Sequence, residues 1–169
     1  MGGHNMIEYE LGSCSLGCVL VAMSEKGVCA IALGDEPSQL VDWLKQKYPH
    51  ARKGAGNAVL LSRLQRVLNY AEWPESALNI ELDIKGTEFQ KRVWQALQTV
   101  PAGETRSYSE IAEKIGSPKS VRAVAGACAA NLLALAIPCH RVIRQDGEMS
   151  GYRWGVERKK MLLQKEAFR

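Results

Sequence analysis

The sequence predicts an α+β protein in which a small sheet with flanking helices precedes a mostly helical region. Before Gly86, strand-like apolar runs are interspersed with segments whose apolar residues recur at helical spacing. After Gly86, helix start signals follow one another. We therefore expect two domains, 1–85 and 86–169, and the 169 residues allow a core in each.

The first half is expected to form a hairpin, two amphipathic helices and a last strand. Gly27 suits the hairpin turn, because glycine adopts a positive φ at little cost. Ser38 is the expected N-cap of the first helix, and Pro49 ends that helix. The segment 50–57 lacks apolar periodicity and is expected to be a loop. The expected strands span 12–23, 28–33 and 78–84, and the expected helices span 38–48 and 59–71.

The second half carries start signals for a series of short helices. Capping-box spacing occurs at Thr87 with Gln90 and at Ser107 with Glu110. Gly116 is expected to turn the chain, and Ser117 to cap the next helix with Pro118 in its first turn. A short helix, a tight turn and a second helix are typical of a helix-turn-helix.

The composition is that of an ordinary globular protein, with 46% hydrophobic and 24% charged residues. No apolar run approaches the roughly 18 residues of a membrane span. The N-terminus lacks the basic and then apolar pattern of a signal peptide. We therefore expect a cytoplasmic protein without a membrane partner.

The charge is distributed unevenly along the chain. Residues 1–85 carry 8 Lys and Arg against 10 Asp and Glu, whereas residues 86–169 carry 14 against 8. A basic second half favours a polyanionic partner such as nucleic acid. An ordinary solvated surface is the alternative that charge alone leaves open.

Five cysteines with irregular spacing argue against a disulfide framework and for reduced thiols. A zinc site is conceivable at Cys14, Cys18, Cys29 and His4. However, these residues lack the paired short spacings of structural zinc sites. We expect neither a metal nor another cofactor.

Cys139 lies between a proline and a histidine in an otherwise apolar segment, 137–143. A cysteine is a strong nucleophile only as the thiolate, and a neighbouring base such as His140 can generate it. Pro138 makes a regular helix or central strand unfavourable here. The alternative is a buried structural cysteine beside a chance histidine.

The second helix of the expected helix-turn-helix has one long side chain, Arg122, among small residues. Helices that read bases in the major groove usually present several long polar residues. A flat face with one arginine suits close, shape-based contact with a nucleic-acid backbone in the minor groove. Packing of the small residues against a neighbouring helix is the alternative.

Five residues in a fixed order now point to a family. Tyr108 opens a short helix, Arg122 lies in the next, Asn131 precedes Cys139 by eight residues, and Glu166 lies on the last helix. With them, the chain resembles the O6-alkylguanine-DNA alkyltransferases, most closely their bacterial adaptive-response branch. The resemblance spans essentially the whole chain. It implies a ribonuclease H-like domain over 1–85 and a DNA-binding, alkyl-acceptor domain over 86–169.

The resemblance implies direct reversal of DNA damage by a monomer. Cys139 would take the alkyl group from O6 of guanine, or O4 of thymine, irreversibly and once per molecule. The damaged base must leave the duplex, because a stacked base cannot reach a thiol. His140 would deprotonate Cys139 through a water, with Glu166 orienting the histidine. Tyr108 would hydrogen-bond the flipped base and is a candidate acid; a surface ion pair for Glu166 and a core position for Tyr108 are the alternatives.

The resemblance also implies contacts with double-stranded DNA. Arg122 would fill the gap left by the flipped base, and Asn131 would link its helix to the active-site turn, although asparagine is also a common helix C-cap. Tyr152 and Arg153 would form the pocket wall, and Arg153 would favour methyl over bulky adducts. The full expected DNA- and base-binding set is Arg122, Ala123, Gly126, Asn131, Val142, Tyr152 and Arg153.

Two other functions are alternatives to alkyl transfer. A lesion-binding sensor without transfer would need another residue in place of Cys139. A cysteine hydrolase would need an oxyanion hole and a water-accessible second step, for which the sequence has no signal. We expect either a single-domain relative of the family or one domain of a longer protein.

Overall fold

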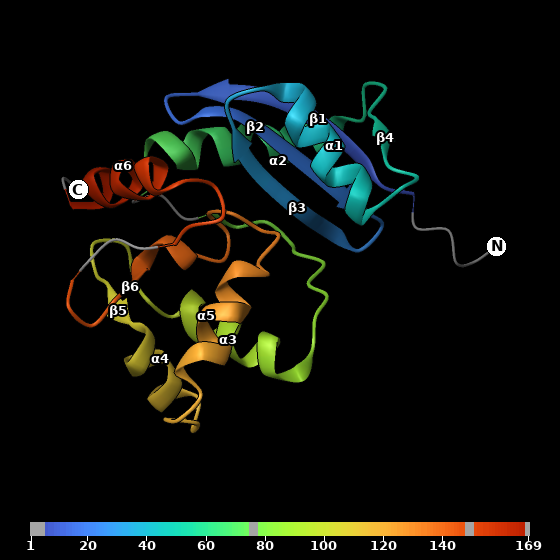
Figure 1. The fold of residues 1–169 in the computed structure, drawn as a ribbon. Coiled ribbons are helices and arrows are strands. Elements are labelled where there is room, and N and C mark those ends of the chain that lie inside the picture. Colours follow the sequence, from blue (N-terminus) through green and yellow to red (C-terminus); the bar gives the residue numbers. More distant parts are fainter. Residues whose placement is uncertain (1–5, 75–77, 148–150, 168–169) are drawn as a thin grey trace. The chain divides into compact units, whose positions relative to one another are not determined.

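The computed structural model describes residues 6–74, 78–147 and 151–167 (Figure 1). The chain divides into two compact units, Met1–Ile84 and Lys85–Arg169, and each is described by itself. The described strands and helices make this a mixed α+β protein, in agreement with the predicted class.

The first unit is built on a four-stranded sheet with the order β3-β2-β1-β4. The strands are β1 (Glu8–Cys14), β2 (Gly17–Ser24), β3 (Gly27–Gly34) and β4 (Arg52–Lys53). Neighbours pair antiparallel except β1 with β4, which are parallel. The expected hairpin is confirmed, and in it Val21 pairs with Ile31.

The single strand expected over 12–23 is wrong, because the chain turns within it. β1 ends at Cys14, and β2 begins at Gly17 with a φ of 114°. Such an angle is favourable only for glycine, so Gly17 permits the tight reversal that the apolar run concealed. As a result, β2 pairs antiparallel with β1 on one side as well as with β3 on the other.

The helices of the first unit are α1 (Pro37–Lys47) and α2 (Ala58–Glu72). The Ser38 cap is wrong: Glu36 is the N-cap and makes no side-chain capping bond, while Pro37 supplies a first residue with a preset φ. Asn57 caps α2, its side chain accepting hydrogen bonds from the backbone of Val59 and Leu60. The buried face of α2 includes Leu60 and Leu64.

The strand expected over 78–84 is also wrong. Only a single parallel bridge forms, between Leu82 and Val28, with hydrogen bonds of 2.9 and 2.8 Å on either side of it. A bulge between Ala22 and Met23 interrupts the register at this end of the sheet, and bulges increase local twist. The alternation in the sequence instead follows exposure, since the apolar residues at 78, 80, 82 and 84 are half-buried whereas Asn79 and Glu81 are exposed. Asp83 breaks this pattern: it is buried and accepts a 2.6 Å hydrogen bond from Ser24.

The second unit is mostly helical. Its elements are α3 (Glu88–Gln98), β5 (Arg106–Ser107), α4 (Tyr108–Lys114), α5 (Val121–Ala129), the 3₁₀ helix η1 (Cys139–Arg141), β6 (Val142–Ile143) and α6 (Val156–Ala167). Both predicted capping boxes, at the starts of α3 and α4, are confirmed. Ser117 is not the cap of α5: it bonds Ser120, and the helix begins only at Val121.

A short parallel pairing of β5 with β6 joins two distant parts of the second unit. Ser107 lies opposite Ile143 in this pair. Tyr108, the first residue of α4, is therefore held beside the segment that follows η1. The indole of Trp94 on α3 donates a 2.8 Å hydrogen bond to the carbonyl of Ala127, which ties α3 to α5.

None of the helices described here has the length and apolar character that crossing a membrane requires.

Candidate active site

Cys139 begins the 3₁₀ helix η1 and is only 7% exposed. Asn131 holds the turn that leads to it. The side-chain amide of Asn131 donates to the carbonyl of Ile137 at 2.9 Å and to Sγ of Cys139 at 3.3 Å. Its Oδ1 accepts from the backbone of Leu133 at 2.8 Å. Asn131 is thus fully engaged with the turn, whereas the residue at the C-cap of α5 is Ala130.

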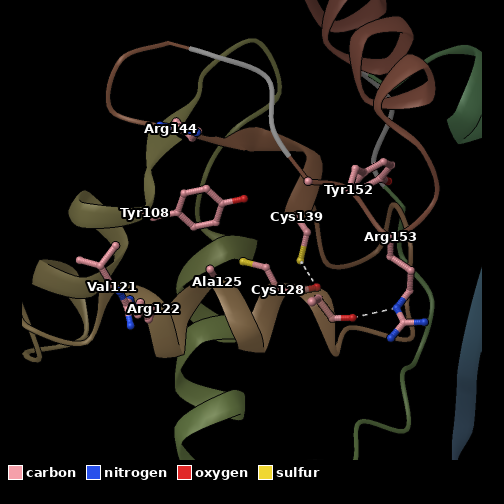
Figure 2. A pocket seen from close by; sticks show the side chains of 11 residues that line it. Tyr108, Val121, Arg122, Ala125, Cys128, Cys139, Arg144, Tyr152 and Arg153 are labelled. Carbon is pink, nitrogen blue, oxygen red and sulfur yellow. Dashed lines mark hydrogen bonds between the residues drawn. The ribbon is translucent and has the colours of Figure 1, made fainter.

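A pocket of about 460 Å³ opens onto Cys139. Figure 2 shows the side chains around it, with Tyr108 and Cys139 directed into the same space. The lining residues come from α4, α5, η1 and the segments after β6: Tyr108, Val121, Arg122, Ala125, Cys128, Ala129, Cys139, Arg144, Gly151, Tyr152 and Arg153. The pocket therefore combines a buried thiol with two phenols and arginines.

The two phenols of the pocket are strong candidates for hydrogen-bond donors. Burial raises the pKa of Tyr108 to about 12, so its hydroxyl is protonated at neutral pH. Burial also raises the pKa of Tyr152. The hydroxyl of Tyr152 is buried and has no hydrogen-bond partner among the described residues. A buried polar atom without a partner is costly, so a bound molecule that supplied one would be stabilised.

Behind Cys139, three charged or titratable side chains form a buried cluster. Nε2 of His140 lies 2.7 Å from Oε2 of Glu166. Arg141 donates to both carboxylate oxygens of Glu166, at 3.0 and 2.8 Å, and to the carbonyl of Val100 at 2.7 Å. Glu166 is 1% exposed, so the alternative of a surface ion pair is wrong.

The protonation of this cluster follows from its contacts. Burial alone would raise the pKa of Glu166, but hydrogen bonds from His140 and Arg141 lower it to about 2. Burial lowers the pKa of His140, so the imidazole is neutral near pH 7. The ionised carboxylate then accepts a hydrogen bond from Nε2–H, which leaves Nδ1 as an acceptor. Within the described residues Nδ1 has no partner and is available as a base.

Cys139 itself is held as a thiol. Its Sγ donates to the carbonyl of Cys128 at 3.6 Å. The pKa of Cys139 is raised well above the usual value, first by a side-chain hydrogen bond with Cys128 and then by burial. Asn131 and the ammonium of Lys159 act in the opposite direction. Activation of the thiol therefore requires a base or a change in these contacts.

The exposed face of α5 borders the pocket. Arg122 lines the pocket, whereas Ala123 and Gly126 lie on the exposed face outside it. A Cβ placed on Gly126 would meet no atom within 4 Å, so this face is open. Val142 does not line the pocket: it is fully buried in β6, and its carbonyl accepts a 2.6 Å hydrogen bond from Lys159.

Arg153 joins the loop after β6 to the end of α5. Its Nε donates a 2.8 Å hydrogen bond to the carbonyl of Ala129, drawn in Figure 2, and its guanidinium lies 5.7 Å from the centre of the Trp154 ring. Arg153 is thus held in the pocket wall by two contacts. Residues 148–150 of the same loop lie outside the described residues.

Several residues of the site were missed from the sequence. Cys128 and Arg144 line the pocket, and Arg141 and Lys159 are buried behind it. Lys159 had a usable signal, since it precedes Glu166 by seven residues and so shares its helix face. Cys128 had none, because nothing in a run of small residues distinguishes the pocket side of α5.

Among the described residues, no three His, Cys, Asp or Glu side chains are grouped in a way that could hold a metal ion. His4, considered above as a zinc ligand, lies outside the described residues.

Comparisons with known proteins agree on one family. Residues 88–168 match the family described as 6-O-methylguanine DNA methyltransferase, DNA binding domain. The chain is 51% identical over 167 residues to the bifunctional transcriptional activator/DNA repair enzyme Ada of Escherichia coli, covering 98% of this chain and 47% of that protein. The chain therefore spans about half the length of such Ada relatives.

Two further relatives match over nearly their whole length. The methylated-DNA–protein-cysteine methyltransferase of Mycolicibacterium paratuberculosis is 40% identical, with 94% of this chain and 91% of that protein covered. The crystal structure of Mycobacterium tuberculosis O6-methylguanine methyltransferase superposes with a TM-score of 0.80 at 35% identity, covering 97% and 94% of the two chains. The chain belongs to the methylated-DNA–protein-cysteine methyltransferase family.

Proposed function

We propose that this protein repairs DNA by moving an alkyl group from O6 of a flipped-out guanine, or from O4 of thymine, to Sγ of Cys139. The observation that carries the proposal is Cys139 itself, at the base of a pocket with two phenols and backed by His140 and Glu166. Family membership supports the same reaction. Because a thioether is stable, each molecule acts once.

The contacts around Cys139 suggest how the transfer proceeds. Nδ1 of His140, free to accept a proton, takes the Cys139 proton through a bridging water. The buried carboxylate of Glu166 stabilises the imidazolium that forms. The thiolate attacks the alkyl carbon, the carbon–oxygen bond breaks, and Tyr108 donates a hydrogen bond to the departing base. These assignments are proposals for Cys139, His140, Glu166 and Tyr108.

We propose that α4 and α5 act as a helix-turn-helix on double-stranded DNA. The open face around Ala123 and Gly126 would approach the minor groove closely, and Arg122 would occupy the place of the flipped base. The excess of basic residues over 86–169 supports phosphate contact. Asn131, Tyr152 and Val142 would hold the turn and the base, since Asn131 bonds Cys139 directly.

The remaining proposals concern the rest of the chain. The sheet unit would be a ribonuclease H-like domain over 1–85, since its sheet is mixed: β1 pairs antiparallel with β2 and parallel with β4. Arg153, bonded to α5, would restrict the pocket and favour methyl over bulky adducts. We also propose a monomer that works in the cytoplasm, where reducing conditions keep Cys139 a thiol.

The test is intact and peptide mass spectrometry after incubation with duplex DNA that contains one O6-methylguanine. We expect the peptide holding Cys139 to gain one methylene, saturating at one per protein. The Cys139→Ser variant should bind the duplex without a mass gain. DNA binding without any gain by the wild-type protein would mean a lesion sensor, and multiple turnovers would mean a hydrolase.

A further inference from the structure

The pocket contains a second thiol. Cys128, from α5, and Cys139, from η1, both line it. Sγ of Cys139 lies 3.6 Å from the backbone oxygen of Cys128, and Figure 2 shows both sulfur atoms on the same side of the pocket, near the hydroxyl of Tyr108. The mechanism above uses only one of the two sulfurs.

Cys128 also influences the protonation of Cys139. The side-chain hydrogen bond with Cys128 is the largest cause of the raised pKa of Cys139. Cys128 is half-buried, whereas Cys139 is buried. A disulfide would require the sulfurs to approach to about 2 Å. A bridge of two carbons is longer than a disulfide, so it requires less approach of two sulfurs that line the same pocket.

We infer that Cys128 is a second acceptor for one class of lesion, guanine carrying a 2-haloethyl group at O6. This inference rests on the proposed transfer to Cys139. A transferred methyl group is inert, and Cys128 has no part in that reaction. A transferred haloethyl group keeps a leaving group on its second carbon and lies next to a nucleophile.

The two steps balance as follows. The Cys139 thiolate bonds the first carbon, and the electron pair of the bond from that carbon to O6 stays on O6. The proton that Cys139 gave up passes to the base, so that guanine is restored. The Cys128 sulfur then bonds the second carbon, halide leaves with the electron pair of the carbon–halogen bond, and the Cys128 proton goes to water. The product is an ethylene bridge between Cys128 and Cys139, and no oxidant or reductant is consumed.

The second step competes with attack by water and by DNA. Well-oriented intramolecular groups reach effective molarities of about 10⁵ M or more, far above the concentration of bulk water. A thiol is also intrinsically the better nucleophile. Since Cys128 is in the pocket wall, it meets the halide-bearing carbon before solvent does. The bridge thereby prevents attachment of the reactive protein to DNA.

The experiment uses two duplexes that differ in one lesion, O6-methylguanine or freshly prepared O6-(2-chloroethyl)guanine. The wild-type protein is digested without reducing agent and its peptides are identified by mass. We expect the methyl duplex to modify Cys139 alone. The chloroethyl duplex should link the peptides of Cys128 and Cys139 through one ethylene group, in roughly tenfold or greater excess over a hydroxyethyl adduct.

Two variants locate the second thiol. Cys18→Ser, in β2 of the other unit, should give the wild-type products, whereas Cys128→Ser should give a hydroxyethyl adduct on Cys139 or attachment to DNA. A wild-type protein that carries hydroxyethyl on Cys139 with Cys128 unmodified overturns the inference. So does attachment to DNA in equal yield with and without Cys128. Absence of methyl on Cys139 with the first duplex would instead contradict the proposed function.

Discussion

The two units of the chain differ in what they bury. The sheet unit buries apolar side chains such as Leu20, Ile31 and Leu60, together with the polar or acidic Glu10, Ser24 and Asp83. The helical unit also has an apolar core, but its buried polar set, among the described residues, combines basic with acidic side chains: Ser107, Asn131, His140, Arg141, Lys159 and Glu166. Buried charge is stable only where each group is paired and hydrogen-bonded.

This difference shows where function constrains the sequence. An apolar core can be repacked with other hydrophobic residues of similar volume at modest cost. The buried cluster cannot, because Glu166 bonds both His140 and Arg141, and each contact depends on the others. In the helical unit, burial of charged groups costs folding free energy, and the result is a fixed arrangement of charges behind Cys139.

The largest expected effect comes from removing the central carboxylate. Glu166→Gln removes the carboxylate that pairs with Arg141 at 2.8 Å, and breaking a buried ion pair costs about 3 to 5 kcal/mol. Transfer to Cys139 should slow as well, since His140 loses the group that stabilises its charged form. Denaturant unfolding and a methyl-transfer time course measure the two effects.

Two controls sharpen this first comparison. Glu157→Gln, at the exposed end of α6, should change stability by no more than about 0.5 kcal/mol. Leu20→Ala should cost about 2 to 5 kcal/mol yet leave transfer per folded molecule unaltered. Equal loss of transfer in Leu20→Ala and Glu166→Gln would contradict the claim that the buried cluster, and not the apolar core of the sheet unit, governs transfer.

Acid should destabilise the protein through the same cluster. The pKa of His140 is lowered in the folded state, so below about pH 6.5 the unfolded chain binds a proton that the folded chain does not. Glu166 contributes stability above a pKa of 4.5, which is lost as the pH falls toward about 2. Its share is about 3 kcal/mol. Denaturant midpoints at a series of pH values should fall steadily below about 6.5, and a flat profile would contradict the buried neutral histidine.

A moderate effect is expected from Lys159→Met. This change removes a donor that bonds the carbonyl of Val142 at 2.6 Å, and an unsatisfied buried carbonyl costs about 1 to 3 kcal/mol. Loss of the ammonium should also raise the pKa of Cys139 further, because Lys159 lowers it. The pH dependence of Cys139 alkylation by iodoacetamide reports this shift. Lys160→Met, at an exposed neighbour, should leave both quantities unaltered.

The smallest expected effect concerns a helix start. Ser107 accepts a 3.0 Å hydrogen bond from the backbone of Glu110, so Ser107→Ala should cost about 1 kcal/mol. The side chain of Ser117 bonds the hydroxyl of Ser120 and does not cap α5, so Ser117→Ala should cost less than about 0.5 kcal/mol. Thermal unfolding of the pair distinguishes them, and equal losses would mean that capping is not the cause.

Much of the helical unit could be predicted because its signals are local. A capping box joins residues three apart, and the structure has both of the predicted ones. The start of α5 was missed because Ser117 and Pro118 imitate a helix start, although the chain there only turns. In the sheet unit, the apolar run over 12–23 concealed a reversal that depends on the φ of Gly17. Periodicity reports burial and not pairing, which is why the strand over 78–84 was wrong.

The site was less predictable than the helices. The sequence motif singles out Cys139 and His140, and the family resemblance adds Glu166, but neither indicates that Arg141 and Lys159 are buried beside them. Cys128 becomes significant only once α5 is packed against η1, because its neighbour in space lies eleven residues further along the chain. Contacts of this kind depend on tertiary structure and leave no local pattern.

The hydrogen bond from Cys139 to the carbonyl of Cys128 has a consequence for storage. That carbonyl lies in the last turn of α5, the end of a helix that carries partial negative charge and disfavours a nearby anion. The thiol consequently keeps its proton while the protein waits. A protein that can react only once loses its function if its thiol reacts with small electrophiles or oxidants of the cell. The end of α5 protects Cys139 from such reactions by keeping it protonated.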